Sequence, residues 1–291
     1  MESMEKLGIG IVGVGLWGRN YVRTLAESNA CQIFVADVAE KNLKGLQDVR
    51  VVSFPELLAH DGIKALIIAT PDNTHFPLAV QALKAGKDVL VEKPMALSVE
   101  EAEEMLLLAQ RRKRIIAIAH TPIYSCSFDL LKSQIEGIAK KDIIRIEAIR
   151  TSQGRNNGSD VLWDLACHDL AMAISLFGLP KKAKTIRREH HTCQYKMIFN
   201  NDIEFIGIAS WSDPPFHREF KVYTRERVYQ FQEPIGAKGL KSNLPLSRMC
   251  SDFIRCSYTR ARPLSDGVLG LNVIRCLTLL SQEGDEVKCS Q

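Results

Sequence analysis

Three side chains of types that move protons stand out in the sequence: Lys93, Asp164 and His168. Lys93 follows an apolar run that ends at Glu92, and it precedes Pro94. A proline disfavours helical geometry in the residue before it, so Lys93 is expected to lie extended at the carboxyl end of a strand. A lysine in that place is more often only a solvated charge. The position therefore makes Lys93 a candidate for chemistry and no more.

Asp164 and His168 lie four residues apart in a segment with the apolar spacing of a helix. Both side chains are therefore expected on one side of that helix. A carboxylate one turn from an imidazole orients the ring and raises its basicity, as a general base for a hydroxyl group requires. An exposed, solvated Asp/His pair has the same spacing, and the spacing alone favours this simpler interpretation.

A glycine-rich turn in residues 8–18, GIGIVGVGLWG, follows an apolar strand and leads into helical spacing, as a dinucleotide-binding unit requires. The first glycine allows the turn, the second lets backbone approach a pyrophosphate, and the third lets helix and strand pack closely. The N–H groups at the start of the helix then face the phosphates. The candidate cofactor residues of this turn are Gly13, Gly15, Leu16, Trp17 and Gly18.

Asp37 ends a second apolar strand, 19 residues after Gly18, where the adenosine ribose hydroxyls are expected. A carboxylate there accepts ribose hydrogen bonds and repels a 2′-phosphate, so NAD is preferred over NADP. Lys41 and Lys44 lie nearby and would offset part of that charge.

Two later apolar runs also end in polar residues, at 70–75 and at 92–93. Ligands of open α/β sheets bind outside the carboxyl ends of the strands, so both loops are expected beside the cofactor. Helix capping is the simpler role of the 72–74 side chains, and it is compatible with cofactor binding. The candidate cofactor residues here are Thr70, Pro71, Asn73, His75, Glu92 and Lys93.

The length of 291 residues predicts two domains, and the secondary-structure elements of these domains position the candidate residues. Strands and helices alternate through residues 1–120, which predicts a Rossmann domain, a doubly wound parallel sheet of the α/β class. Residues 121–291 are predicted to form an α+β domain for substrate binding and oligomerisation. The apolar alternation after residue 182 is typical of antiparallel strands. The last helix is expected to pack on the first domain.

The composition, with 46% hydrophobic and 25% charged residues, is that of an ordinary globular protein. The net charge of +4 is small and spread along the chain, which argues against nucleic-acid and membrane partners. Eight cysteines without a CxxC pair, no signal peptide and no membrane-spanning stretch predict a cytoplasmic protein with reduced thiols. We expect no metal, because His190 and His191 are adjacent strand residues that point to opposite faces.

The glycine turn, Asp37, ATPDNTH (69–75) and VLVEKPMALSVEEAEEM (89–105) together resemble the Gfo/Idh/MocA family of NAD(P)-dependent oxidoreductases. The resemblance implies a second domain with a mostly antiparallel open sheet and a cofactor between the two domains. It also implies a homodimer or homotetramer built through that sheet.

WDLACHDL (163–170) is similar to the family's D-x-x-x-H helix, whose Asp and His stand with the EKP lysine at the substrate. The resemblance therefore makes Lys93, Asp164 and His168 catalytic candidates and reverses the preference for a solvated pair. A tryptophan before the Asp and an HD pair resemble the members that act on nucleotide-linked sugars. The candidate substrate residues are Lys93, Tyr124, Arg155, Trp163, Asp164 and His168.

The predicted function is hydride transfer between NAD and a hydroxyl or ketone of a sugar, with a nucleotide-linked hexose oxidised at C3 as the expected substrate. One alternative is an NAD(H)-binding sensor or interaction protein without turnover. The other is a glycosidase that oxidises the sugar transiently and shows no net reduction of the cofactor.

Overall fold

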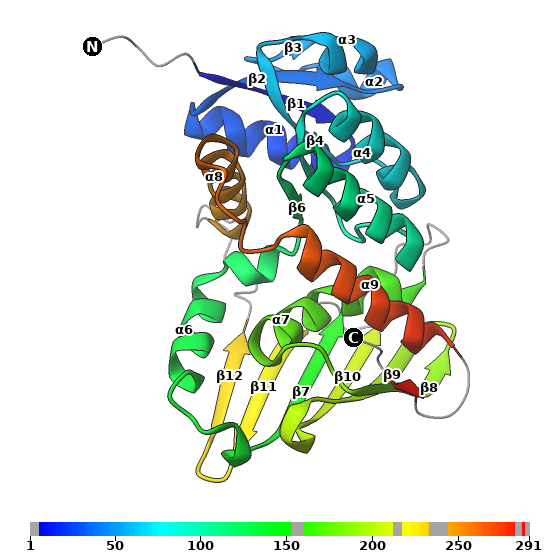
Figure 1. The fold of residues 1–291 in the computed structure, drawn as a ribbon, viewed down its shortest axis with the longest axis vertical. Coiled ribbons are helices and arrows are strands. Elements are labelled where there is room, and N and C mark those ends of the chain that lie inside the picture. The colour runs from blue at the N-terminus through cyan, green and yellow to red at the C-terminus, as the bar shows by residue number, and fades with distance from the viewer. Residues whose placement is uncertain (1–5, 153–159, 212–216, 233–243, 283–286, 289–291) are drawn as a thin grey trace. The chain divides into compact units, whose positions relative to one another are not determined.

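The structure is a computed structural model that describes residues 6–152, 160–211, 217–232, 244–282 and 287–288. The chain divides into two compact units. The first contains residues 1–119 and 243–271, and the second contains residues 120–242 and 272–291 (Figure 1). Chain segments from both halves of the sequence therefore build the first unit.

The first unit has a six-stranded sheet in which every strand pairing is parallel. The strand order is β3-β2-β1-β4-β5-β6, so the chain reverses direction across the sheet after β3. The strands are β1 (Leu7–Val12), β2 (Cys31–Ala36), β3 (Arg50–Val51), β4 (Ile63–Ile68), β5 (Asp88–Val91) and β6 (Ile116–Ile118). This order confirms the predicted doubly wound Rossmann sheet.

Strands β1 and β5 are buried along their whole length, as expected of parallel strands covered on both faces. The helices of this unit include α1 (Leu16–Ser28), α2 (Glu40–Leu43), α3 (Phe54–Ala59), α4 (His75–Lys84) and α5 (Val99–Arg112). Helix α4 begins at His75, directly after the short 3₁₀ turn η1 (Asp72–Thr74). Pro77 is therefore in the first turn of α4, where the helix needs no N–H donor.

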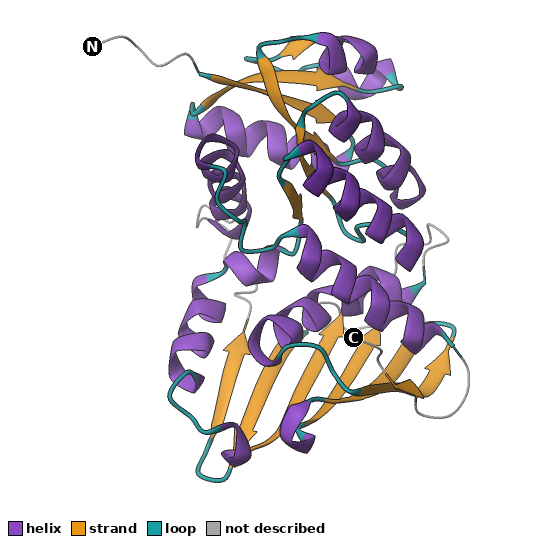
Figure 2. Cartoon of the chain, in the orientation of Figure 1, coloured by secondary structure: helices purple, strands orange, loops and turns teal. Residues whose placement is uncertain are grey.

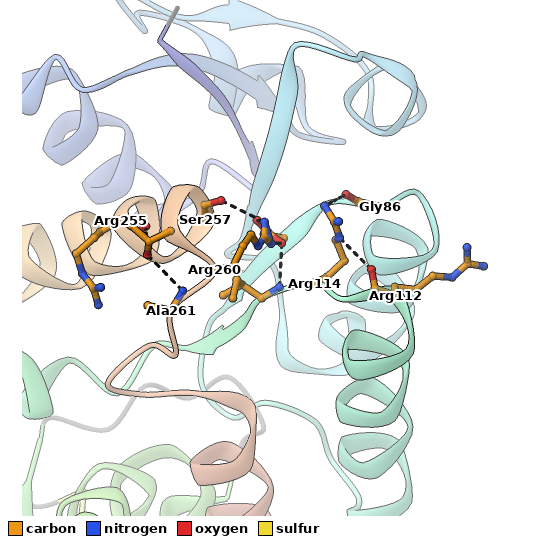
Figure 3. A network of polar contacts seen from close by, with 10 residues as sticks. Gly86, Arg112, Arg114, Arg255, Ser257, Arg260 and Ala261 are labelled. Carbon is orange, nitrogen blue, oxygen red and sulfur yellow. Dashed lines mark hydrogen bonds and ion pairs between the residues drawn. The ribbon is translucent and has the colours of Figure 1, made fainter. Parts of the chain in front are cut away.

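The returning segment adds α8 (Leu244–Thr259) and the start of α9 (Gly267–Ser281) to the first unit. Helix α8 packs against α1. Just after α8, Arg260 donates hydrogen bonds of 2.9 and 2.5 Å to the buried carboxylate of Asp88 and also bonds the carbonyl of Ser257 (Figure 3). Ile118 N–H also donates to the carbonyl of Ser265. These contacts bind the returning segment to strands β5 and β6.

The second unit has a seven-stranded sheet in the order β12-β11-β7-β10-β9-β8-β13. Figure 2 shows its strands in orange, and Figure 1 gives their labels. Only the β7–β10 pairing among the described strands is parallel, which confirms the predicted mostly antiparallel sheet. The strands are β7 (Ile143–Thr151), β8 (Lys182–Glu189), β9 (Thr192–Ile198), β10 (Glu204–Ser210), β11 (Arg218–Thr224), β12 (Val228–Gln232) and β13 (Val287–Lys288).

Helix α6 (Cys126–Ile135) packs against β12. In helix α7 (Cys167–Phe177), most residues are buried. The segment before α7 differs from the single α-helix that the sequence predicts. Leu162–Ala166 forms a turn of π-helix, labelled η4, in which the backbone is wound more widely than in an α-helix. No helix among the described residues is long and apolar enough to cross a membrane.

Candidate functional site

The glycine turn of the first unit leads into helix α1, and no side chain that the structure describes caps the start of this helix. Gly13 has a φ of +85°, and a Cβ added at Gly18 would lie 2.0 Å from the carbonyl oxygen of Gly13, so both positions require glycine. Among the described residues, none has an atom within 4 Å of a Cβ added at Gly15, and none caps α1 with its side chain. The start of α1 therefore has no side-chain cap from the described part of the chain and leaves room beside Gly15, as pyrophosphate binding requires. Leu16 and Trp17, the next two residues, are exposed.

Asp37 follows β2, and its carboxylate contacts the same turn. Its oxygens accept hydrogen bonds from Val14 N at 2.6 Å, Ala39 N at 2.8 Å and Asn42 Nδ2 at 3.1 Å. Burial would raise the pKa of Asp37, but these three hydrogen bonds outweigh burial and lower it. An ionised acceptor therefore stands at the end of the second strand, beside the glycine turn.

His75 joins the loops that follow β4 and β5. Its ring is buried, with Nδ1 2.7 Å from the carbonyl oxygen of Pro94 and Nε2 2.9 Å from that of Thr70. Within the first loop, the Thr74 hydroxyl donates to Thr70 Oγ1 at 2.6 Å. The role of His75 in this structure is therefore to hold two loops together at the carboxyl edge of the sheet. Pro71 and Asn73 lie in the same loop, and both are exposed.

Glu92 and Lys93 are the first residues after β5 and are both half-buried. Glu92 Oε1 accepts a 2.6 Å hydrogen bond from the hydroxyl of Tyr21 on α1. Its Oε2 accepts from Lys93 N at 3.2 Å, and its own N–H donates to Ile68 O on β4. A cis peptide bond joins Lys93 to Pro94.

In the second unit, Asp164 lies within the π-helical turn η4. Its Oδ2 accepts a hydrogen bond of 3.2 Å from the indole N–H of Trp211, which directly follows β10. The π winding changes the angle between residues four apart but keeps them on one side of the helix, so Asp164 and His168 still share a side. The indole of Trp211 connects the Asp164 carboxylate to the sheet.

His168 is half-buried on the first turn of α7 and lies edge-on to the buried ring of His120. The ring centroids are 6.1 Å apart, and the rings are nearly perpendicular. Next to His168, Asp169 forms a buried ion pair with Arg150 of β7, with N–O distances of 2.7 to 3.1 Å. This pair fixes the start of α7 to the sheet.

The other predicted substrate residues have different surroundings. Trp163 is half-buried, and its indole N–H donates to Ser281 Oγ at 2.9 Å. Tyr124 is buried at the end of the short helix η2 (Thr121–Tyr124). Arg155 lies outside the described residues. Within the described residues, there is no group of three or more His, Cys, Asp or Glu side chains suited to a metal ion.

The side chains that contact the candidates and that sequence reasoning missed include Tyr21, His120 and Trp211. Arg150 was missed as well, and it pairs with Asp169, the neighbour of His168. Trp211 and His120 had a usable signal, since Trp211 directly follows a strand and His120 lies two residues after one, as Lys93 does. Tyr21 and Arg150 become visible only through contacts between distant segments.

The first unit thus has the features that a dinucleotide needs, namely an open helix start, an ionised acceptor after the second strand and ordered loops after the next two. These features define a dinucleotide-binding Rossmann protein. Residues 7–120 match the Gfo/Idh/MocA family model, described as "Oxidoreductase family, NAD-binding Rossmann fold". The match confirms the predicted family and the predicted cofactor, NAD.

Two curated relatives extend this comparison. The chain is 32% identical over 190 residues to the uncharacterized oxidoreductase YdgJ of Escherichia coli (strain K12), a match that covers 60% of this chain and 55% of YdgJ. It is 31% identical over 178 residues to the UDP-N-acetylglucosamine 3-dehydrogenase of Acidithiobacillus ferrooxidans, covering 60% of this chain and 56% of the relative. The chain therefore spans about half the length of the curated relatives it matches.

Among solved structures, GenD2 from gentamicin A biosynthesis, in complex with NAD, matches with a TM-score of 0.90. The match covers 100% of this chain and 98% of GenD2 at 18% identity. This similarity establishes the fold, and it includes the second unit that the family match does not reach.

Proposed function

We propose that this protein transfers a hydride between NAD and a sugar hydroxyl or ketone, and that its substrate is a nucleotide-linked hexose oxidised at C3. The observation that carries the proposal is the second unit's cluster, in which Trp211 holds the Asp164 carboxylate and His168 stands on the adjoining helix turn. The UDP-N-acetylglucosamine 3-dehydrogenase relative supports this substrate class.

The chemistry divides between cofactor and side chains. The chemistry that NAD would supply when bound is a hydride acceptor for the carbinol carbon. The hydroxyl proton must leave at the same time, and His168 takes it as general base. Asp164, kept in place by Trp211, favours the charged imidazolium that results. Lys93 supplies positive charge to the oxygen as negative charge develops there. The roles of Lys93 and His168 are exchangeable in this scheme.

Absorbance of reduced nicotinamide, followed with a panel of UDP-sugars, tests the proposal. At least one sugar is expected to reduce NAD, and Lys93→Met, Asp164→Asn and His168→Ala are each expected to lower kcat by about 10²- to 10⁴-fold. His217→Ala, which removes an exposed histidine of β11's flank, is the matched control and is expected to keep the wild-type rate. Unchanged turnover in both Lys93→Met and His168→Ala contradicts the proposed roles.

The same assay separates the two alternative functions. An NAD(H)-binding sensor binds the cofactor and consumes no sugar on the panel. A glycosidase that oxidises its sugar transiently releases sugar from a glycoside while the cofactor shows no net reduction. Either result replaces the dehydrogenase proposal.

We also propose that the chain forms a homodimer or homotetramer through the sheet of the second unit. Alternate residues of β7 and β10 are half-exposed, and the neighbouring Ile149 and Ile208 form an apolar pair on that face. Ile208→Arg is expected to shift the mass measured by light scattering to that of a monomer. Leu130→Arg, on the exposed side of α6, is the control and is expected to leave the mass unchanged. A monomeric wild-type protein contradicts the proposal.

A further inference from the structure

A tyrosine inside the phosphate-binding helix of the first unit holds the acidic residue after β5. Tyr21 is fully buried on α1, yet its hydroxyl reaches Glu92 Oε1 at 2.6 Å. That length is typical of a strong hydroxyl–carboxylate hydrogen bond. Tyr21 and Glu92 are 71 residues apart in sequence, so this bond is a tertiary link between α1 and the carboxyl end of β5.

Glu92 is held at several points. One carboxylate oxygen accepts from Tyr21, the other from Lys93 N, and the backbone N–H of Glu92 donates to Ile68 O. Glu92 is half-buried, so the surroundings of its carboxylate screen charge less than open water does.

The place of this carboxylate determines its effect on the cofactor. In a doubly wound sheet the nicotinamide end of the dinucleotide lies at the carboxyl edge, beyond the helix that binds the pyrophosphate. Tyr21 belongs to that helix and Glu92 to that edge. The oxidised nicotinamide ring carries a positive charge, and the reduced ring is neutral. A fixed negative charge near the ring therefore favours the oxidised form over the reduced form.

We propose that Tyr21 is a positioning residue that fixes the Glu92 carboxylate so that the first unit binds NAD⁺ more tightly, relative to NADH, than it would without this bond. The inference rests on the proposed role of Glu92 as a cofactor residue. The ammonium of Lys93 acts in the opposite sense, and it is the same in each of the variants compared below, so it does not affect the comparison.

The test is the ratio of the two dissociation constants, Kd(NADH) over Kd(NAD⁺), measured by calorimetry and by NADH fluorescence. Tyr21→Phe removes only the hydroxyl and is expected to lower this ratio about three- to tenfold, mainly by weakening NAD⁺ binding. Glu92→Gln is expected to lower it at least as much. The double variant is expected to resemble Glu92→Gln alone, because the hydroxyl acts through the carboxylate.

Tyr258→Phe is the matched control. It removes a hydroxyl in the same unit that bonds Leu7 N at 3.0 Å, at the amino end of β1, and it is expected to leave the ratio unchanged. Thermal unfolding of each variant shows whether it is folded. If Tyr21→Phe does not fold, Glu92→Gln compared with Glu92→Asp decides the question, since the aspartate keeps the charge and is expected to retain part of the ratio.

A ratio equal to that of the wild type in Tyr21→Phe and Glu92→Gln, with both variants folded, overturns the inference and leaves the proposed dehydrogenase intact. Wild-type protein that binds both nicotinamide forms and oxidises no sugar refutes the proposed function, while the ratio still tests the inference. A wild-type protein that binds neither form overturns both.

Discussion

The carboxylate oxygens of Asp37 hold the glycine turn in place and are also the expected acceptors for the ribose hydroxyls. Its carboxylate organises the glycine turn through Val14 N and the following loop through Ala39 N and Asn42. Each oxygen of a carboxylate offers two lone pairs, so a ribose hydroxyl still finds an acceptor there. The preference for NAD therefore depends on a group that the turn itself keeps ionised.

Asp37→Asn is expected to weaken NAD binding about tenfold and to lower the free energy of unfolding at pH 7 by about 1 kcal/mol. The folded-state pKa of Asp37 lies below its ordinary value of 3.8, so its stabilisation is fully present above that value. The stabilisation is lost as pH falls through the folded-state pKa. Urea unfolding between pH 3 and pH 7 is therefore expected to show a wild-type advantage that shrinks with falling pH. An advantage independent of pH contradicts this account.

The start of α7 is positioned by an ion pair rather than by its own helical geometry. The π-helical turn carries Trp163 and Asp164, and the first α turn carries His168 and Asp169. Asp169 is tied to Arg150 on β7, and Asp164 to Trp211 after β10. The Asp164 carboxylate and the helix turn that carries His168 are thus both connected to the central, parallel strand pair of the sheet.

Removing one partner of this buried ion pair leaves an uncompensated charge. Arg150→Met and Asp169→Asn are each expected to lower the free energy of unfolding by about 3–5 kcal/mol. The double variant Arg150→Met with Asp169→Asn is expected to cost less than the sum, because neither charge remains buried alone. Denaturant titration of the four proteins gives the coupling energy. Additive losses would mean that the pair contributes nothing as a pair.

Matched substitutions at an exposed pair provide the control. Arg187 and Glu189 also form an ion pair, but both side chains are more than half exposed. Arg187→Met is expected to change stability by less than about 1 kcal/mol.

The elements of this fold were largely predictable because each is specified by local apolar spacing. Strands and helices alternate through the first 120 residues as predicted, and the glycine turn lies where its motif places it. The π-helical turn was not predictable, since LWDLA has ordinary helical spacing and its widening depends on packing.

Contacts between distant segments were also beyond the sequence. The bond between Tyr21 and Glu92 requires α1 to lie beside the end of β5, and nothing in either segment specifies the other. The Arg150–Asp169 pair likewise joins a strand to a helix, while each residue alone resembles a surface charge. The candidate list from the sequence therefore held the residues of the motifs and lacked the residues that support them.

At the scale of the whole molecule, the first unit is closed by residues from the second half of the chain. Helix α8 covers α1, Arg260 pairs with Asp88, and an added Cβ at Gly270 would lie 2.6 Å from Ile118 of β6. We therefore expect residues 244–271 to open and close together with the Rossmann sheet. NAD binding should then protect both segments equally, because a ligand stabilises the whole cooperative unit that binds it.

Labelling of the cysteine thiols measures whether the Rossmann sheet and residues 244–271 open together. Cys31 of β2 and Cys250 and Cys256 of α8 are buried in the first unit, whereas Cys126 is exposed. Burial raises the pKa of Cys31 and of Cys256 to about 11, so their thiols react slowly unless the unit opens. At moderate urea, NAD at about 100 times its Kd is expected to slow labelling of all three by about 100-fold, while Cys126 labels at once in every sample. Mass spectrometry of labelled peptides measures each rate. If NAD protects Cys31 and leaves Cys250 and Cys256 unprotected, the returning segment is not part of the cooperative unit that holds the cofactor.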